Sequence, residues 1–197
     1  MNETLIFLDE GFVYKLSKYF GYGKPVKFDR IYFAKNLVLK QKFVCKKIFY
    51  YNAPPFQSYP PTKEEEKRKE GYDRFIRKIS YNPLIIIREG RCQRLKIDGK
   101  FIYKQKAVDS LAIIDLMKVP LKYPNIKEII IISSDSDFVP IIESLKEFNI
   151  KTILYTYYEK KRNTNFSRSN ELIKSVHKYV LLSKEDFNNA SLTKNEN

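Results

Sequence analysis

The sequence predicts an α/β fold, with a mainly parallel sheet flanked by helices and an added β-hairpin. The first observation is the short β-branched run Ile129–Ile132, which does not alternate with polar residues and so is typical of a strand buried on both faces. The second is that such runs are followed by apolar residues at helical spacing, as expected where parallel strands alternate with helices. The third is an Asp98-Gly99 pair between two alternating segments, a strong hairpin signal.

Composition indicates one domain with a polyanionic partner. The 197 residues contain 43% hydrophobic residues, 37 Lys and Arg and 23 Asp and Glu, for a formal net charge of +14. Such a charge favours nucleic acid or an anionic membrane surface. The sequence shows neither an apolar run of bilayer length nor a secretory signal peptide, so we expect a cytoplasmic protein that binds nucleic acid and no membrane. Cys45 and Cys92 are isolated, which favours buried thiols over a disulfide or zinc site.

The first strand is expected over Thr4–Leu8 and ends at Asp9. Apolar residues then recur at i, i+4, i+7 and i+8 from Phe12 to Phe20, which predicts one apolar face of a helix. Asp9 therefore lies between a strand and a helix. It would be either a helix cap or a functional carboxylate.

The next segments predict a helix over Lys27–Lys40 and a strand over Val44–Tyr51. A loop over Asn52–Thr62 follows, which is too rich in proline for a helix or a central strand, and then a second helix over Lys63–Ile79. The loop's aromatic residues Phe56 and Tyr59 are expected to pack onto the domain, with stacking on bases as the less favoured alternative. The charge run of the helix over Lys63–Ile79 is typical of a solvated helix face.

A short strand over Leu84–Ile87 precedes the predicted hairpin, along which cations are frequent. This basic ribbon would guide a phosphate backbone or form a strand edge that lysines protect. A helix over Ala107–Lys118 follows. Asp109 falls in its first turn and is the candidate for chemistry, whereas Asp115 points to another side and is expected to be structural.

The stretch Glu128–Pro140 carries the densest polar signal. Ser133, Ser134, Asp135 and Asp137 follow the apolar strand directly, and a helix is expected from about Phe138. Serine and aspartate are preferred helix caps. Ligands also bind at the carboxyl ends of parallel strands, where two carboxylates would suit a hard cation.

The C-terminal part predicts a strand over Lys151–Tyr155, a basic loop with aromatic residues over Thr156–Ser169, and a closing helix over Asn170–Leu182. The loop has the composition used for single-stranded nucleic acid, although a mobile surface loop is an equal alternative. Its candidate substrate-binding residues are Lys160, Lys161 and Arg162. His177, the only histidine, is expected on the surface without a catalytic role. One domain is expected over residues 1–184, followed by a polar, disordered tail over residues 185–197.

Four aspartates share one context, namely Asp9, Asp109, Asp135 and Asp137. In a doubly wound sheet these positions converge, and clustered carboxylates repel one another unless a cation neutralises them. We therefore expect a site for Mg²⁺ or Mn²⁺. A metal held by carboxylates beside a basic surface indicates phosphodiester hydrolysis.

The same residues resemble a known family. The segments L-I-F-L-D, I-F-Y-Y-N-A-P-P, K-Q-K-A-V-D-S-L-A-I-I-D and I-I-I-S-S-D-S-D-F-V-P-I-I-E are similar to the NYN domain, and more narrowly to the LabA-like branch of the PIN-like nuclease superfamily. The resemblance runs from about Leu5 to Leu182. It implies a Rossmann-like parallel sheet and a metal-dependent ribonuclease, with the four aspartates as its metal-binding catalytic site and Lys106 near substrate phosphate.

Two positions depart from the family pattern. Phe12 stands where the family's first motif usually has asparagine, and Ser134 replaces a glycine. Neither change removes an acidic residue, so the predicted site is retained. Both changes leave the catalytic rate and the choice of substrate open. Ser133 and Ser134 are further candidates for substrate contact.

The leading hypothesis is a ribonuclease that cleaves single-stranded RNA, by endonucleolytic cleavage. The alternative is a catalytically weak or inactive RNA-binding or adaptor protein with the same fold. A phosphatase of small phosphoesters ranks third, because a small substrate does not need a charge of +14. The sequence leaves the oligomeric state open, a homodimer included.

Overall fold

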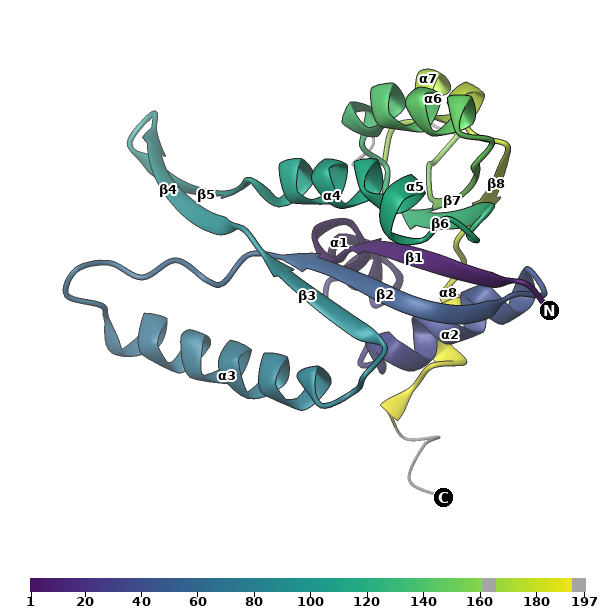
Figure 1. The fold of residues 1–197 in the computed structure, drawn as a ribbon. Coiled ribbons are helices and arrows are strands. Elements are labelled where there is room, and N and C mark those ends of the chain that lie inside the picture. Colours follow the sequence, from purple (N-terminus) through teal and green to yellow (C-terminus); the bar gives the residue numbers. More distant parts are fainter. Residues whose placement is uncertain (161–165, 193–197) are drawn as a thin grey trace.

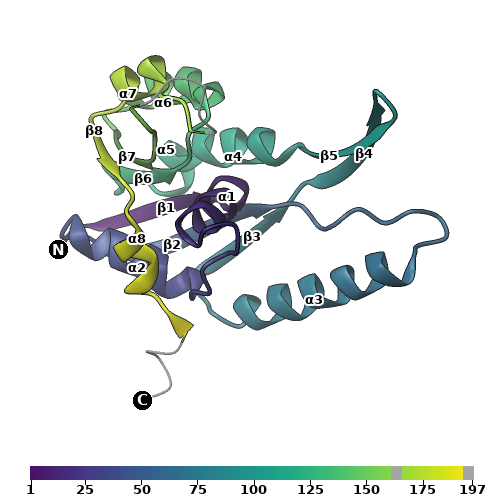
Figure 2. The ribbon, with the colours of Figure 1, turned by 180° about the vertical axis from the view of Figure 1, so that it is seen from behind.

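The computed structural model describes residues 1–160 and 166–192, which form a six-stranded parallel sheet flanked by helices (Figures 1 and 2). The predicted fold class is confirmed. The strands of this sheet are β1 (Glu3–Asp9), β2 (Val44–Asn52), β3 (Ile85–Glu89), β6 (Glu128–Ile132), β7 (Lys151–Thr156) and β8 (Lys178–Leu181). Their order is β3-β2-β1-β6-β7-β8, and every neighbouring pair is parallel.

Helices connect and cover these strands. They are α1 (Glu10–Phe20), α2 (Arg30–Lys40), α3 (Lys63–Ser80), α4 (Val108–Met117), α5 (Val119–Lys122), α6 (Val139–Glu147), α7 (Asn170–Ser175) and α8 (Lys184–Asn188), with the 3₁₀ helix η1 at Ser136–Phe138. The strand order reverses direction between β1 and β6. In such sheets the crevice at the carboxyl ends of the two central strands is the usual ligand position.

The sheet separates two apolar cores, because successive side chains of a strand point to opposite faces. In β1, Ile6 and Leu8 pack with α1 and α2, whereas Leu5 and Phe7 pack with α4 and α6. Figure 1 shows α1 and α2 on one side of the sheet and α4 to α6 on the other. Burial on both faces explains why the central strands are continuous apolar runs.

Residues 91–106 form the predicted hairpin as a separate two-stranded sheet of β4 (Arg91–Ile97) and β5 (Lys100–Lys106). Its turn has positive φ at Asp98 (50°) and Gly99 (76°), as a type I′ turn requires. The hairpin projects beyond the sheet on the same side as the loop between β2 and α3 (Figures 1 and 2).

The predicted closing helix over Asn170–Leu182 is confirmed for Asn170–Ser175 and wrong beyond it. Helix α7 ends at Ser175, and Lys178–Leu181 form β8, which pairs in parallel with β7. The backbone of Val176 is extended at the helix end. Pairing with an open sheet edge has overridden the helical spacing of the apolar residues.

The polar tail predicted from residue 185 is also wrong for its first part. Phe187 and Ala190 are fully buried in the core beside α2, and Ser183 and Asp186 form a capping box at α8. Two apolar side chains therefore anchor a segment whose composition is otherwise polar. Residues 193–197 lie outside the described residues. In the described part of the chain no helix is both long and apolar enough to cross a membrane.

Candidate active site

The four predicted aspartates lie around the carboxyl edge of β1 and β6. Asp9 is the last residue of β1, and Asp135 follows β6 after two serines. Asp137 lies in η1, and Asp109 is the second residue of α4. Because Leu8 pairs with Ile132, the next residues Asp9 and Ser133 come side by side. The Ser133 hydroxyl donates a hydrogen bond to Oδ2 of Asp9 at 3.0 Å.

Two of these aspartates also cap helices, so the simpler interpretation of the sequence holds in part. Oδ1 of Asp9 accepts from the backbone N–H of Phe12 at 3.2 Å at the start of α1. Oδ1 of Asp135 accepts from the backbone N–H of Asp137 at 2.9 Å at the start of η1. The Asp135 N–H donates to the Ser133 hydroxyl at 3.2 Å, which links the β6 loop to Asp9.

Burial and like charge raise the proton affinity of this cluster. Burial raises the pKa of Asp9 to about 6, and the charge of Asp109 adds to the effect. Burial also raises the pKa of Asp109, with further contributions from Asp135 and Asp137. Among residues 1–160 and 166–192, no lysine or arginine forms an ion pair with any of the four. The cluster is therefore electrostatically unbalanced as it stands.

A small pocket explains the burial of Asp9. It is lined by Asp9, Asp109 and Ser133 together with apolar side chains, which are Phe7, Tyr51, Val108, Ala112, Ile131, Ile132 and Phe138. Apolar walls exclude water from the carboxylates and so disfavour their charged forms.

The donor set suits a hard divalent cation in type, since it consists of carboxylate and hydroxyl oxygens. Within the described residues, however, no three Asp, Glu, His or Cys side chains lie close enough together to hold a metal ion. Mg²⁺ commonly binds through one or two carboxylates and completes its coordination with water and substrate phosphate. The cluster therefore fits an open site of that kind and not a closed cage made by protein alone.

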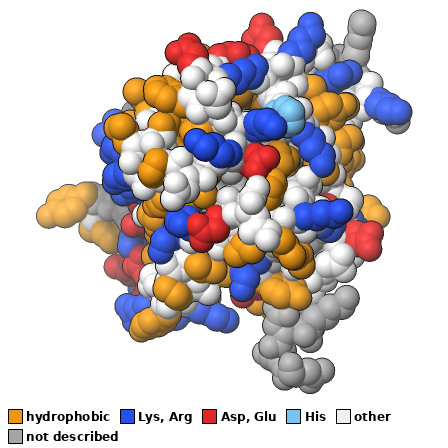
Figure 3. Space-filling model, turned by 45° about the vertical axis from the view of Figure 1, so that its right-hand side comes forward, with side chains coloured by type: hydrophobic (Ala, Val, Ile, Leu, Met, Phe, Trp, Pro, Cys, Tyr) orange, Lys and Arg blue, Asp and Glu red, His pale blue; other side chains and the backbone are white. Residues whose placement is uncertain are grey.

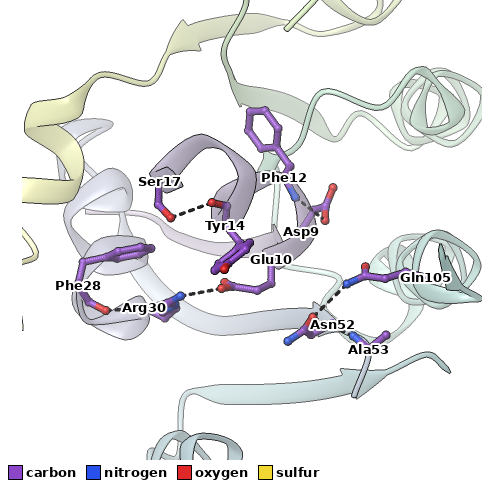
Figure 4. A network of polar contacts seen from close by, with 10 residues as sticks. All are labelled: Asp9, Glu10, Phe12, Tyr14, Ser17, Phe28, Arg30, Asn52, Ala53 and Gln105. Carbon is purple, nitrogen blue, oxygen red and sulfur yellow. Dashed lines mark hydrogen bonds and ion pairs between the residues drawn. The ribbon is translucent and has the colours of Figure 1, made fainter. Parts of the chain in front are cut away.

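Two carboxamides that the sequence did not single out lie beside Asp9 (Figure 4). Asn52 is the last residue of β2, and its Oδ1 accepts from Nε2 of Gln105 on β5 at 3.3 Å. A Cβ on Gly11 would lie 3.1 Å from Oδ1 of Asp9 and 3.3 Å from Oε1 of Gln105, so glycine lets these groups approach. Asn52 follows an apolar strand just as Asp9 does, which is a usable signal. Gln105 carries none, because only the hairpin's fold brings it here.

Phe12, which departs from the family motif, gives the site only its backbone N–H. Its side chain is 6% exposed and belongs to the core between α1 and the sheet. Figure 4 shows the ring turned away from the carboxylate of Asp9.

The other predicted substrate contacts are more dispersed. Lys106 is exposed at the end of β5, three residues before Asp109. Ser134 is partly exposed in the β6 loop, and Lys160 is exposed on the loop after β7. Lys161 and Arg162 lie outside the described residues. Figure 3 shows lysine and arginine side chains spread across one whole face of the molecule, as a net charge of +14 requires.

Comparison with known proteins identifies relatives of the fold. A family model, the NYN domain, matches residues 13–183, a range that contains Asp109, Asp135 and Asp137 and begins after Asp9. A crystal structure of a protein of unknown function from Vibrio parahaemolyticus is similar, with a TM-score of 0.58 and 16% identity over 94% of this chain and 95% of that one. No curated protein matches the chain.

Proposed function

This chain belongs to the NYN domain family, whose members are nuclease-like, and we propose that it is a divalent-metal-dependent ribonuclease. Its substrate would be single-stranded RNA, cut by endonucleolytic hydrolysis of the phosphodiester bond. We further place it in the LabA-like branch, on the motifs described above. The observation that carries the proposal is the group of four aspartates at the carboxyl edge, which have no ion-pair partner among the described residues, in a chain of net charge +14.

Each residue of the group has a distinct task in this proposal. The candidate metal ligands are Asp9, Asp109 and Asp135, with Asp137 as a further ligand or as the group that orients the attacking water, and water and substrate phosphate would complete the coordination of Mg²⁺ or Mn²⁺. The ion would activate water and offset charge on the attacked and leaving oxygens. Asp9 is held by the Ser133 hydroxyl and the Phe12 N–H, so it presents a fixed carboxylate beside the others. Its apolar surroundings exclude bulk water from the reacting group.

The substrate backbone would be held by cations near this edge. Lys106 is the nearest of them along the chain, since it precedes Asp109 by three residues. Phosphate contacts of this kind give salt-dependent affinity without sequence preference. Ser134, partly exposed in the loop that carries Asp135, would contact the substrate directly. Ser133 is fully buried and would act through Asp9, which its hydroxyl holds.

Replacing Asp135 by asparagine tests the proposal. Asparagine caps a helix as well as aspartate does, so the fold of η1 should survive while one carboxylate is lost. We expect metal-dependent cleavage of end-labelled single-stranded RNA to fall by about 100-fold or more, as for the loss of other directly catalytic groups. The control is Asp73→Asn, which makes the same chemical change on the remote helix α3. Full cleavage by the Asp135→Asn protein, or equal loss in both variants, would refute the assignment.

A second function is favoured by the absence of a polar side chain at Phe12 and of a ready-made three-ligand metal group in the described residues. It is RNA binding without efficient cleavage. Under this alternative, the protein would bind single-stranded RNA with steep salt dependence in chelator and would not cleave it in Mg²⁺ or Mn²⁺. Cleavage that appears with metal and disappears in Asp135→Asn would exclude it.

A further inference from the structure

The β4–β5 hairpin exposes aromatic side chains on one of its two faces. Directly opposed residues of a hairpin share a face, and two neighbouring pairs are Lys96 with Phe101 and Arg94 with Tyr103. Phe101 is 56% exposed and Tyr103 is 47% exposed. We call these four residues the aromatic face of the hairpin. Exposed rings alternating with cations are the composition that binds single-stranded nucleic acid.

The rings of this face are held in place by neighbours. The guanidinium of Arg94 lies 4.6 Å from the ring centroid of Phe101 and 4.7 Å from that of Phe56. The rings of Phe56 and Tyr103 lie 5.8 Å apart, centroid to centroid. Phe56 comes from the loop between β2 and α3, so the hairpin and the loop brace one another.

That loop is itself fixed to the start of α3. The Glu65 carboxylate accepts hydrogen bonds from the Ser58 hydroxyl at 2.5 Å, the Ser58 N–H at 3.1 Å and the Thr62 N–H at 3.0 Å. The Ser58 hydroxyl is the main reason that the pKa of Glu65 falls to about 2. A platform that is already rigid loses little entropy when a base stacks on it.

The aromatic face leads directly to the carboxyl edge of the main sheet. The next cross-strand pair on the same face as Arg94 and Tyr103 is Cys92 with Gln105, and the Gln105 amide reaches Asn52 beside Asp9. At roughly 3.3 Å per residue, Phe101 and Gln105 lie about 13 Å apart along β5. That length accommodates a short single-stranded segment between the exposed rings and the acids.

The charge of the hairpin suits a phosphate backbone. It carries six cations, Arg91, Arg94, Lys96, Lys100, Lys104 and Lys106, against a single acid, Asp98. None of the six forms an ion pair with another residue in the part of the chain that the structure describes. Cations beside partly exposed rings favour a polyanion whose bases are unpaired, because a duplex hides the faces of its bases.

We propose that the aromatic face of the hairpin is a stacking platform for single-stranded RNA, with bases on Phe101 and Tyr103, and that it feeds the strand toward Asp9 and Asp109. This inference rests on the proposed ribonuclease function for its substrate. It adds the place where the substrate is bound and the requirement for unpaired bases.

A sole tryptophan tests the platform directly, because the chain contains none. In Phe101→Trp the reporter stands on the aromatic face. In the control Phe148→Trp it stands at the end of α6, where the native ring has nearly the same exposure, 54%. Both proteins are titrated in chelator with a short oligouridylate, with duplex RNA and with inorganic polyphosphate.

The platform predicts saturable quenching of Phe101→Trp fluorescence by oligouridylate and little change in Phe148→Trp. Duplex RNA and polyphosphate should bind through charge without comparable quenching, because neither offers an unpaired base. Equal quenching in the two variants, or equal quenching by polyphosphate, would overturn the proposal. Quenching that increases with protein concentration in the absence of RNA would also overturn the proposal, because it would make the aromatic face a contact between two copies of the chain.

Truncation provides the energetic test. Phe101→Ala combined with Tyr103→Ala should weaken oligouridylate binding by about tenfold or more, the effect expected for lost base stacking, without changing the slope of log affinity against log salt. Lys96→Gln, on the same face, should instead reduce that slope by about 0.7 for each lost phosphate contact. If truncation leaves the affinity unchanged in a protein of native circular dichroism, the platform is refuted.

The two proposals fail in different ways. Quenching of Phe101→Trp and weaker binding after truncation, without metal-dependent cleavage, would support the stacking platform and refute the ribonuclease proposal. Metal-dependent cleavage that Asp135→Asn abolishes, without quenching of Phe101→Trp, would support the ribonuclease proposal and refute the stacking platform.

Discussion

Two aspartates on the same helix have opposite environments. Asp109 opens α4 at the carboxyl edge of the sheet, where burial is the main cause that raises its pKa and the charges of Asp135 and Asp137 raise it further. Asp115, six residues later, is buried and receives two short hydrogen bonds from Arg88, at 2.7 Å from Nε and 2.8 Å from Nη2. The Tyr51 hydroxyl donates a third at 3.2 Å.

The difference separates structure from function within one helix. A buried carboxylate is tolerated when a cation and hydrogen bonds compensate its lost hydration, and Asp115 has both. Asp109 is grouped with other acids and has no ion pair among the described residues, and its own backbone N–H offsets only part of the rise in its pKa. An uncompensated acid at a ligand-binding edge is therefore better explained by a ligand than by folding.

The largest expected effect is on stability at Asp115. Asp115→Asn leaves the Arg88 guanidinium without its partner and should reduce the free energy of unfolding by about 2–3 kcal/mol. This is less than for a fully buried pair, because the Arg88 side chain is 38% exposed. Thermal unfolding should shift down by roughly 4–12 °C. Asp109→Asn measured alongside should show no such loss, and equal destabilisation by both changes would erase the contrast between them.

An intermediate effect is expected from added metal. Mg²⁺ or Mn²⁺ that binds the folded acids should raise the unfolding midpoint, by about 1.4 kcal/mol of stability at ten times its Kd. The rise should be smaller in Asp135→Asn and smaller in Asp109→Asn. Chelator supplies the baseline. If a variant with one acid removed keeps the full shift, the ion is bound elsewhere.

The smallest effect is expected from relief of repulsion. In chelator at pH 8, Asp109→Asn should raise the unfolding midpoint by roughly 1–3 °C, a modest gain because solvent screens this partly exposed group. The folded-state pKa of Asp109 is raised, so the penalty in the wild type is present above that pKa and disappears below the ordinary value of 3.8. The difference between the two proteins should therefore shrink as the pH falls to 4. A difference that is independent of pH would show that charge repulsion is not its cause.

Much of the fold could be predicted because its signals are local. Strands buried on both faces have continuous apolar sequences that do not alternate with polar residues. The Asp98-Gly99 turn needs two residues that accept positive φ. The same logic placed Asp9, Asp109, Asp135 and Asp137 at strand and helix ends. The mistakes, at β8 and α8, fall where a short segment is decided by its neighbours. Pairing with β7 turned a helical pattern into a strand, and the core beside α2 buried Phe187.

The sequence by itself therefore determined the α/β class, the position of the four acids at the ends of elements, and the basic hairpin. The tertiary structure alone decided which groups meet. It paired Asp115 with Arg88 of β3, brought Gln105 of the hairpin to Asn52 of β2, and placed the ring of Phe56 against Tyr103. The physical reason is distance along the chain. Caps, turns and strand ends are formed by residues that are neighbours in sequence, whereas these contacts join elements whose approach is set by the packing of the sheet and the path of the hairpin.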